Sequence, residues 1–233
     1  MGSVVTSLSI SIPAYNEAAA LPQVLQEAVQ TLEELRLDGE ILLIDDGSTD
    51  ATPQISKEWA GRDPRIRVIR HEKNLGFGTT LKDVFQLPTK DWIFFAPGDG
   101  QIPIGEVKQL LPHTTKSRFI LGWRKNRADP WARKLQAWIY NRIISILMGR
   151  RVHDVDSVVL IQRHLAQKLP LSSQSVFLHA ELALGAAQSG TNILEVPIRH
   201  RPRTGGRPRG AKFSTILRTL KDLGSHILTA HSK

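Results

Sequence analysis

Apolar and polar positions alternate along the first half of the chain in a pattern that predicts short strands separated by helices. The spacing of apolar residues is typical of helices at 18–36, 50–60, 76–86 and 104–111. Between them lie short runs rich in β-branched and aromatic residues, each typical of a strand: LSISIP, EILLID, IRVIR, WIFFA and RFILG. This rhythm favours an α/β fold with a mostly parallel central sheet flanked by helices.

The second half, from about residue 123, is less regular. An apolar stripe at mostly helical spacing predicts a helix at roughly 131–148, and its members are Trp131, Leu135, Trp138, Ile139, Ile143, Ile146 and Leu147. We interpret this stripe as core, with contact to a membrane surface as the alternative. The other predicted elements are a strand at SVVLIQR, a helix at 177–188, a strand at NILEVPI and an amphipathic helix at 213–229. No repeat or low-complexity linker separates the halves, so one domain is expected.

Composition narrows the class of partner. The 233 residues are 41% hydrophobic, enough for a sizeable core, and carry a formal net charge of +9. This basic excess indicates a polyanionic partner: nucleic acid, an anionic membrane surface or a phosphorylated substrate. The lack of cysteine excludes disulfides and thiolate catalysis and fits a reducing compartment. Neither a secretory signal nor an apolar run of about 20 residues is recognisable, so we expect a cytoplasmic protein.

Three polar motifs follow the first, second and fourth predicted strands: PAYNE, DDGSTD and PGDGQ. Each on its own is compatible with an ordinary turn or a helix cap. In open α/β sheets, however, ligands bind at the carboxyl ends of the strands, where these three motifs would meet. In the third motif Asp99 stands between Gly98 and Gly100, which allow the backbone to approach a ligand closely. The sequence therefore predicts one binding site at this edge of the sheet.

Over nearly its whole length the chain resembles family 2 glycosyltransferases of the GT-A fold. The motifs that carry the resemblance occur in the family's order and spacing: SIPAYNE, ILLIDDGSTD, HEKNLGFG, APGDGQ, GWRKNR and HAELALGAAQSGTNILEVPIRHRPR. Within the family, the chain most resembles the polyprenyl-phosphate (dolichol-phosphate) mannosyl- and glucosyltransferases. The resemblance implies a single GT-A domain over residues 1–233 with a Rossmann-like sheet. Residues 1–122 would bind the nucleotide-sugar, and residues 123–233 would form a C-terminal annex that binds the acceptor near the membrane.

The resemblance also implies roles for individual residues of the first half. Nucleotide-sugar binding is expected from Pro13, Ala14, Tyr15, Glu17, Asp45, Asp46, Asn74, Gly98 and Asp99. A divalent cation, Mg²⁺ or Mn²⁺, is expected on Asp99 and Gln101. The family has an Asp-x-Asp motif here, and its first Asp is replaced by Pro97. One carboxylate and an amide oxygen suffice physically for Mg²⁺, because water and substrate phosphate complete its octahedron.

Basic residues cluster at 116–134 and 199–218. Most of them are interpreted as a solvated face or an unspecific nucleic-acid patch, and the exceptions are the positions that match the family pattern, which are expected to bind the acceptor and its phosphate. By resemblance, Arg124 is the phosphate-contacting arginine, with Arg133 and Asn141 in the helix behind it. The segment RPRTGGRPRGAKF is similar to the family's Arg-x-x-Gly-x-Ser-Lys loop. Its lysine would be Lys212, and either Arg203 or Arg207 could be its arginine.

The reaction implied by the resemblance is inverting transfer of a hexose from a nucleoside-diphosphate sugar, of the GDP-mannose or UDP-glucose type, to a polyprenyl phosphate. A phosphate acceptor is already anionic and needs no catalytic base. Instead, Asp99 with its cation and Arg124 would stabilise the leaving diphosphate. A hydroxyl acceptor on a glycan or a lipid is the alternative and would need a base, for which Glu181 is the candidate. Asp154 and Asp156 are further candidate acids, because DVDSVVL resembles the family's Asp-x-x-Ser-Gly-Phe motif. Val158 stands where that motif has Gly, which would change the shape of the acceptor pocket.

The basic clusters and amphipathic helices predict peripheral attachment to the cytoplasmic face of an anionic membrane, or docking to a membrane protein. Specific nucleic-acid binding is not expected, because it would leave the three strand-end motifs without a function. Because Pro97 replaces an expected metal ligand, a degenerate protein that binds nucleotide-sugar without turnover is a further alternative.

Overall fold

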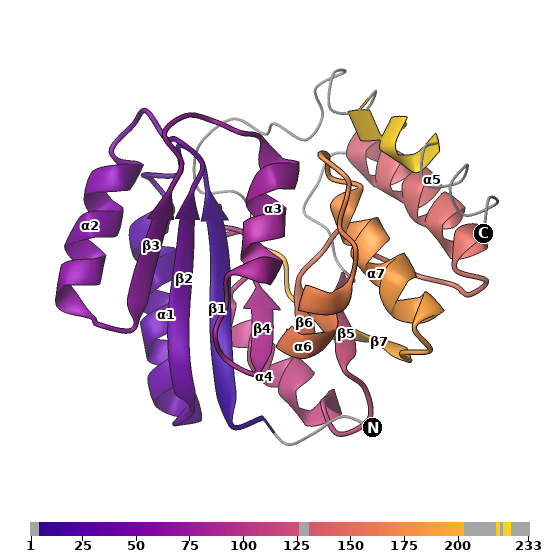
Figure 1. The fold of residues 1–233 in the computed structure, drawn as a ribbon, viewed down its shortest axis with the longest axis horizontal. Helices are drawn as coiled ribbons and strands as arrows, with labels where there is room; N and C mark the ends of the chain where they lie inside the picture. The colour runs from indigo at the N-terminus through magenta and orange to yellow at the C-terminus, as the bar shows by residue number, and fades with distance from the viewer. Residues whose placement is uncertain (1–4, 126–130, 203–217, 220, 225–233) are drawn as a thin grey trace.

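The computed structural model describes residues 5–125, 131–202, 218–219 and 221–224 (Figure 1). The strands are β1 (Ser7–Ala14), β2 (Asp38–Asp45), β3 (Ile66–Arg70), β4 (Trp92–Phe95), β5 (Phe119–Arg124), β6 (Val159–Gln162) and β7 (Ile193–Ile198). The helices are α1 (Leu21–Leu35), α2 (Thr52–Arg62), α3 (Phe77–Gln86), α4 (Val107–Leu110) between two 3-10 turns, η1 (Ile104–Glu106) and η2 (Leu111–His113), then α5 (Trp131–Leu147), α6 (Arg163–Lys168) and α7 (Leu178–Gln188). The last predicted helix, at 213–229, lies largely outside the described residues, and those that are described there are helical.

The strands form one mixed sheet in the order β3-β2-β1-β4-β6-β5-β7. β1 pairs in parallel with β2 and β4, β2 pairs in parallel with β3, and β5 pairs in parallel with β7. β6 runs antiparallel to β4 and β5. The carboxyl ends of the other six strands and the amino end of β6 therefore meet at one edge. The predicted α/β class and the mostly parallel sheet are confirmed.

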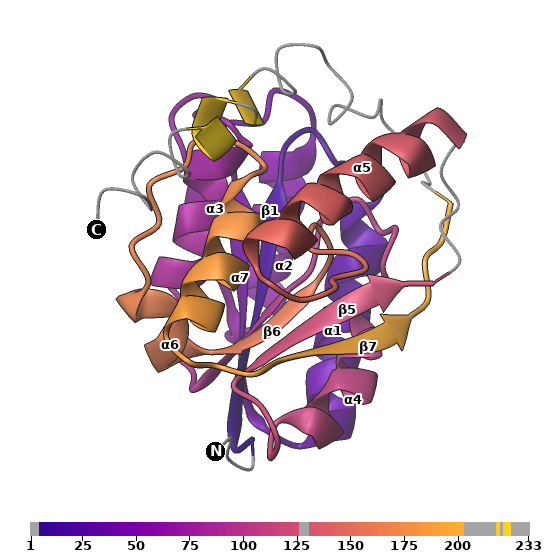
Figure 2. The same ribbon diagram turned by 90° about the vertical axis from the view of Figure 1, so that its right-hand side faces the viewer.

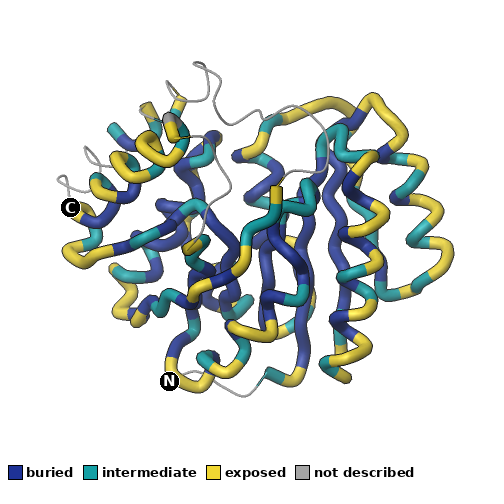
Figure 3. Tube along the Cα trace, turned by 180° about the vertical axis from the view of Figure 1, so that it is seen from behind, coloured by how far each residue is buried: buried dark blue, intermediate teal, exposed yellow. Residues whose placement is uncertain are grey.

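Helices cover both faces of this sheet (Figure 2). One core lies between the sheet and α1, α2 and α4, and the other lies between the sheet and α3, α6, α7 and the inner side of α5. Successive β2 residues alternate between the two cores, with Ile41 and Leu43 in the first and Leu42 and Ile44 in the second. Figure 3 shows the strands as a buried layer with more exposed helices around it. Burial on both faces explains why these strands are continuous apolar runs.

Helix α5 corrects one interpretation made from the sequence. Most of its apolar stripe is exposed rather than core: Trp131, Leu135, Trp138, Ile139, Ile146 and Leu147. Trp131 is 77% exposed and Ile146 is 72% exposed. The side of α5 that faces the sheet carries Ile144, which is buried, and Ile143, which packs against the core. Helical spacing reports that a face is apolar, but it cannot say which face the rest of the fold covers.

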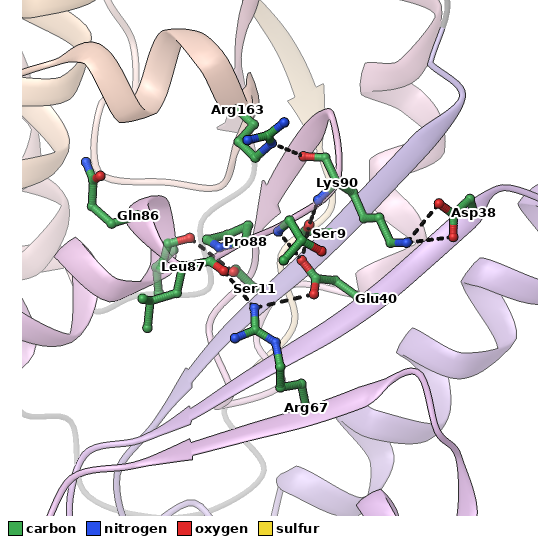
Figure 4. Close-up of polar contacts among 12 residues, drawn as sticks. Ser9, Ser11, Asp38, Glu40, Arg67, Gln86, Leu87, Pro88, Lys90 and Arg163 are labelled. Carbon is green, nitrogen blue, oxygen red and sulfur yellow. Dashed lines mark hydrogen bonds and ion pairs between the residues drawn. The ribbon is translucent and has the colours of Figure 1, made fainter.

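A buried carboxylate ties the opposite, amino-terminal end of the sheet together (Figure 4). Glu40 of β2 accepts hydrogen bonds from the Ser9 hydroxyl at 2.6 Å and from the Thr89 amide at 2.5 Å. Arg67 of β3 lies 3.4 Å from its other oxygen. Burial raises the pKa of Glu40, but these hydrogen bonds and the charge of Arg67 together hold it below the ordinary value. The ionised form therefore stabilises the fold at neutral pH.

We expect Glu40→Gln to lower the free energy of unfolding by about 1–2 kcal/mol at neutral pH, because the charge that Arg67 and the donors favour is lost. A carboxylate whose pKa is lowered by folding stabilises the protein at pH values above its unfolded-state pKa, and this stabilisation is lost as the pH falls. The difference between variant and wild type should therefore shrink below a pH of about 4.3. Denaturant unfolding across this range measures it, with the exposed Glu58→Gln as control. A difference that does not change with pH would contradict this account.

Candidate functional site

The loops after β1 and β2 are joined by side-chain hydrogen bonds to the backbone. The Asn16 side-chain oxygen accepts a hydrogen bond from the Thr49 backbone amide at 2.7 Å, and the Asn16 backbone amide donates to the Ser48 hydroxyl at 2.9 Å. The Glu17 amide donates to the Thr52 hydroxyl at 2.9 Å. Asn16 adopts a left-handed φ of 53°, which Asn tolerates better than most residues. The PAYNE and DDGSTD motifs are therefore neighbours, as their places after parallel strands predict.

The third motif folds against the end of β1. The Gly98 amide donates to the Pro13 carbonyl at 3.1 Å, and a Cβ on Gly98 would lie only 2.8 Å from that oxygen. Gly100 has a φ of 70°, and the Gln101 amide donates to Asp99 Oδ1 at 3.1 Å. These contacts require a glycine at 98 and fix Asp99 in a tight turn. All three predicted motifs thus lie at the same edge of the sheet.

A cavity of about 130 Å³ opens beside this turn. Its polar wall contains Asp99, Gln101 and Arg124, three residues predicted to act together. The remaining lining residues are Phe77, Phe95, Pro97, Ile102, Asp156, Ser157, His179 and His200. They come from the ends of β4, β5 and β7, from the segment before β6 and from α3 and α7. The antiparallel β6 explains how residues 156–157, which precede it, reach the edge where the other strands end.

Arg124, the last residue of β5, is held by a buried acid. Its Nε lies 2.7 Å and its Nη2 2.8 Å from the two oxygens of Asp154, whose side chain is 2% exposed. Nη2 also donates to the Asp156 carbonyl at 3.0 Å. A guanidinium fixed by a two-pronged ion pair keeps its direction when a ligand arrives. Arg124 is thus a preorganised cation on the cavity wall.

A second, larger cavity of about 450 Å³ also has Arg124 in its wall. It lies between the end of β5 and helix α5, and its lining contains three cationic and two tryptophan side chains: Arg124, Lys125, Lys134, Trp123 and Trp138, with Ala137, Asn141 and His153. Asn141, predicted to bind the acceptor, also accepts a hydrogen bond from the Val155 amide at 3.0 Å. Arg133 lies on the same helix but lines neither cavity.

The predicted acids after β2 have structural partners. Asp45 Oδ1 accepts a hydrogen bond from the Ser48 amide at 2.9 Å. Asp46 accepts hydrogen bonds from the amides of Leu75 and Gly76, at 2.8 and 3.0 Å. Asp46 therefore shapes the loop that carries Asn74, whose side chain donates to the Asp46 carbonyl at 3.3 Å. Pro13, Ala14, Tyr15 and Glu17 lie at or just after the end of β1, and nucleotide binding by all these residues stays a prediction.

Glu181 is positioned as a structural carboxylate. Its oxygens accept hydrogen bonds from the amides of Ser172 and Ser173 and from the Ser172 hydroxyl, at 2.5 to 3.1 Å. It does not line the cavity that contains Asp99. This geometry favours fixing the loop before α7 over acting as the predicted base. Arg203, Arg207 and Lys212 lie outside the described residues.

Sequence reasoning missed two histidines of the cavity. His179 lies only two residues before Glu181 on α7, and His200 follows β7. Both belong to a motif that was recognised, but the sequence does not say which side of α7 faces the cavity. His200 Nε2 lies 3.4 Å from the Gln101 side-chain nitrogen. Among the described residues, no three acidic or histidine side chains form a metal cluster. The cation expected on Asp99 and Gln101 stays a prediction, and His200 lines the same cavity beside them.

His71, which follows β3, lies between two carboxylates. Nδ1 lies 2.8 Å from Asp46, and Nε2 lies 2.8 Å from Asp83 of α3. Burial lowers the pKa of His71, but the hydrogen bonds and charges of the two acids together raise it above the ordinary value of 6.5. His71 thereby links the loop after β2 to α3.

We expect Asp83→Asn to lower the pKa of His71 by removing one of the two charges that stabilise the imidazolium. NMR titration of the imidazole measures this shift. A raised histidine pKa contributes stability fully below the unfolded value of 6.5, and that stability is lost as the pH rises through the folded value. The exposed Asp38→Asn, at the opposite end of β2, is the matched control and should leave the titration unchanged. An unshifted titration in Asp83→Asn would show that Asp46 alone sets it.

Comparison with known proteins places the chain in a family. The family model described as Glycosyl transferase family 2 matches residues 9–167. A curated relative, undecaprenyl-phosphate 4-deoxy-4-formamido-L-arabinose transferase of Proteus mirabilis, is 26% identical over 230 residues, which are 97% of this chain and 69% of the relative.

Solved structures of glucosyl-3-phosphoglycerate synthase from Mycobacterium tuberculosis have a similar fold. Its complex with Mn²⁺, UDP-glucose and phosphoglyceric acid matches with a TM-score of 0.68 and 18% identity, covering 94% of this chain and 79% of that one. Its complex with Mn²⁺, UDP and phosphoglyceric acid matches with a TM-score of 0.66 and 19% identity, and the match covers 94% of this chain and 73% of that one. At such identities the likeness concerns the fold alone. The family model, which matches well over half of the chain, shows more: this protein belongs to glycosyl transferase family 2.

Proposed function

We propose that this protein transfers a hexose from a nucleoside-diphosphate sugar, of the GDP-mannose or UDP-glucose type, to the phosphate of a polyprenyl phosphate at a membrane surface. The observation that carries the proposal is that Asp99 and the fixed guanidinium of Arg124 line one cavity at the carboxyl edge of the sheet. The relative from Proteus mirabilis, whose name specifies an undecaprenyl-phosphate acceptor, supports this acceptor class. The similar fold crystallised with UDP-glucose supports the donor class.

In this proposal the cavity residues stabilise the departing diphosphate. Asp99, with Gln101 and His200, would hold Mg²⁺ or Mn²⁺, ions that are present in the solved structures of similar fold. The cation would supply positive charge to the diphosphate oxygens. Arg124 adds a second positive charge whose direction is already set by Asp154. Charge fixed in place before the reaction needs no rearrangement when the bond to the sugar breaks.

The second cavity is suited to the acceptor phosphate. It shares Arg124 with the first cavity, and Lys125 and Lys134 add positive charge. Trp123 and Trp138 supply apolar surface for the first carbons of a lipid chain. A phosphate held here would lie next to the first cavity, because Arg124 lines both. Such an acceptor is a nucleophile without a base, in agreement with the structural partners of Glu181.

A donor screen tests the reaction. Purified protein is mixed with Mg²⁺ or Mn²⁺, a short-chain polyprenyl phosphate and each of several GDP- and UDP-sugars, and released nucleoside diphosphate is measured. We expect release with one donor, and a loss of roughly 100-fold or more in Asp99→Asn and Arg124→Lys, because each removes transition-state charge or its geometry. Arg118→Lys is the matched control, since Arg118 lies just before β5 and pairs with Thr191. Binding of nucleotide without any release would favour the degenerate alternative.

Peripheral attachment to the cytoplasmic face of a membrane is part of the proposal. None of the helices in the described ranges is long and apolar enough to cross a bilayer. The exposed apolar stripe of α5 is bordered by exposed basic residues at Lys134, Arg142, Arg150 and Arg151. An apolar helix face flanked by cations is suited to lie in an anionic membrane surface, where each Lys or Arg contributes about 1 kcal/mol. Trp138 belongs both to this stripe and to the second cavity, which would bring a lipid phosphate to Arg124.

We expect the double variant Trp131→Ser, Ile146→Ser to bind vesicles of phosphatidylcholine and phosphatidylglycerol at least tenfold more weakly than wild type, because apolar area leaves the membrane. Cosedimentation with the vesicles measures this. Leu87→Ser, which removes a side chain exposed just after α3 and beside Arg67 at the amino-terminal end of the sheet, is the control and should bind as wild type does. Equal binding by all three proteins, or binding that does not require the anionic lipid, would contradict attachment through α5.

A further inference from the structure

Two residues that line the Asp99 cavity each carry a buried polar atom with no hydrogen-bond partner. Among the described residues, five buried side-chain polar atoms are in this state, and two of them, His179 Nε2 and Ser157 Oγ, belong to residues that line this one cavity. Both residues are 2% exposed. Buried polar groups are nearly always satisfied, since leaving one unpaired costs free energy. Two such atoms in one cavity point to a ligand that completes them.

The ring of His179 is held in one orientation. Nδ1 lies 3.0 Å from Asp156 Oδ1. The ring centroid lies 4.7 Å from that of Phe95, and Phe77 and Phe85 approach it at 6.2 and 6.3 Å in edge-to-face geometry. Because Nδ1 faces a carboxylate, the proton of the neutral ring belongs on Nδ1. Nε2 then presents a lone pair, and the missing partner is a hydrogen-bond donor.

The rest of the cavity wall indicates what carries that donor. Phe77, Phe95, Pro97 and Ile102 form its apolar part. Ser157 can both donate and accept, and the Asp156 carboxylate can accept. Apolar and aromatic surface combined with a few hydrogen-bonding groups is suited to a sugar ring, which has apolar C–H faces and hydroxyls at its rim. A phosphate, which offers mainly acceptor oxygens, would leave a neutral His179 without its donor.

We propose that Ser157 and His179 form a subsite that binds hydroxyl groups of the transferred sugar, with His179 Nε2 accepting a hydrogen bond from one of them. Asp156 is a positioning residue that fixes the tautomer and direction of His179. This inference rests on the proposed function, since it assumes that a nucleoside-diphosphate sugar occupies the site. Ser157 and His179 would let the protein bind a nucleotide that carries the sugar more tightly than the nucleotide alone.

Binding measurements test the sugar subsite separately from the proposed transferase function. Isothermal titration in the presence of Mg²⁺ compares UDP with UDP-glucose and GDP with GDP-mannose for each protein. The informative ratio is the affinity for the nucleotide-sugar divided by the affinity for the nucleotide. We expect His179→Asn, which can keep the hydrogen bond to Asp156 but lacks the Nε2 atom, to reduce this ratio about 5- to 20-fold while nucleotide binding stays unchanged. Ser157→Ala should reduce it by a smaller factor.

Matched variants control for general damage to the fold. His179→Gln places an amide near the position of Nε2 and should restore much of the ratio. Ser11→Ala removes a buried serine whose hydroxyl donates to the Val84 carbonyl rather than facing the cavity, and should leave the ratio unchanged. Analogues of the donor that lack one hydroxyl identify the contact. Wild type should bind the analogue without the contacted hydroxyl more weakly than the full donor. His179→Asn should bind that analogue and the full donor equally well.

The outcomes are distinguishable. If neither nucleotide nor nucleotide-sugar binds to wild type, the proposed function fails, and this inference fails with it. If wild type prefers the nucleotide-sugar and both His179→Asn and Ser157→Ala keep that preference, only the subsite is wrong. Unchanged binding with a large loss of turnover in His179→Asn would also overturn it, because His179 would then act on the acceptor. Should His179→Asn not fold, judged by thermal unfolding, Ser157→Ala and the deoxy analogues decide.

Discussion

The parallel pairing of β1 with both β2 and β4 is the constraint on which the site depends. It brings the ends of three strands to one edge. There the backbone hydrogen bond from Gly98 to Pro13 joins the loop after β4 to the end of β1, and the Asn16 side chain joins the loops after β1 and β2. The antiparallel β6 adds a segment that enters this edge from the other direction. Asp99, Arg124 and His179, which are far apart in the sequence, therefore line a single cavity. Without this arrangement each would be an ordinary turn, strand-end or helix residue.

Most of the acids around the site organise the protein rather than face the cavity. Asp46 binds the loop after β3, Asp154 fixes Arg124, and Glu181 binds the segment before α7. In each case a carboxylate satisfies several donors, which is how a buried charge becomes tolerable. Within the described residues, Asp99 and Asp156 are the acids on the cavity wall. A site assembled in this way holds its cations and donors in fixed directions before any ligand binds.

Helix α5 connects the site to the protein's surroundings. Its inner side packs on the sheet through Ile144, and its outer side exposes Trp131 and Ile146. Between these two sides, Trp138 lines the second cavity next to Arg124. The same helix therefore offers an apolar outer surface and one wall of a basic cavity. In the proposed function, this combination serves an acceptor phosphate carried on a lipid chain.

The sequence by itself determined the α/β class, the place of most helices and strands, and the edge at which the polar motifs meet. It could do so because strand and helix periods, glycine turns and motif order are local properties of the chain. It did not determine which face of α5 is covered, or that His179 rather than Glu181 would face the cavity. Both depend on how a helix is rotated against distant strands. Such rotation is set by packing between segments far apart in the chain, so only the tertiary structure decided it.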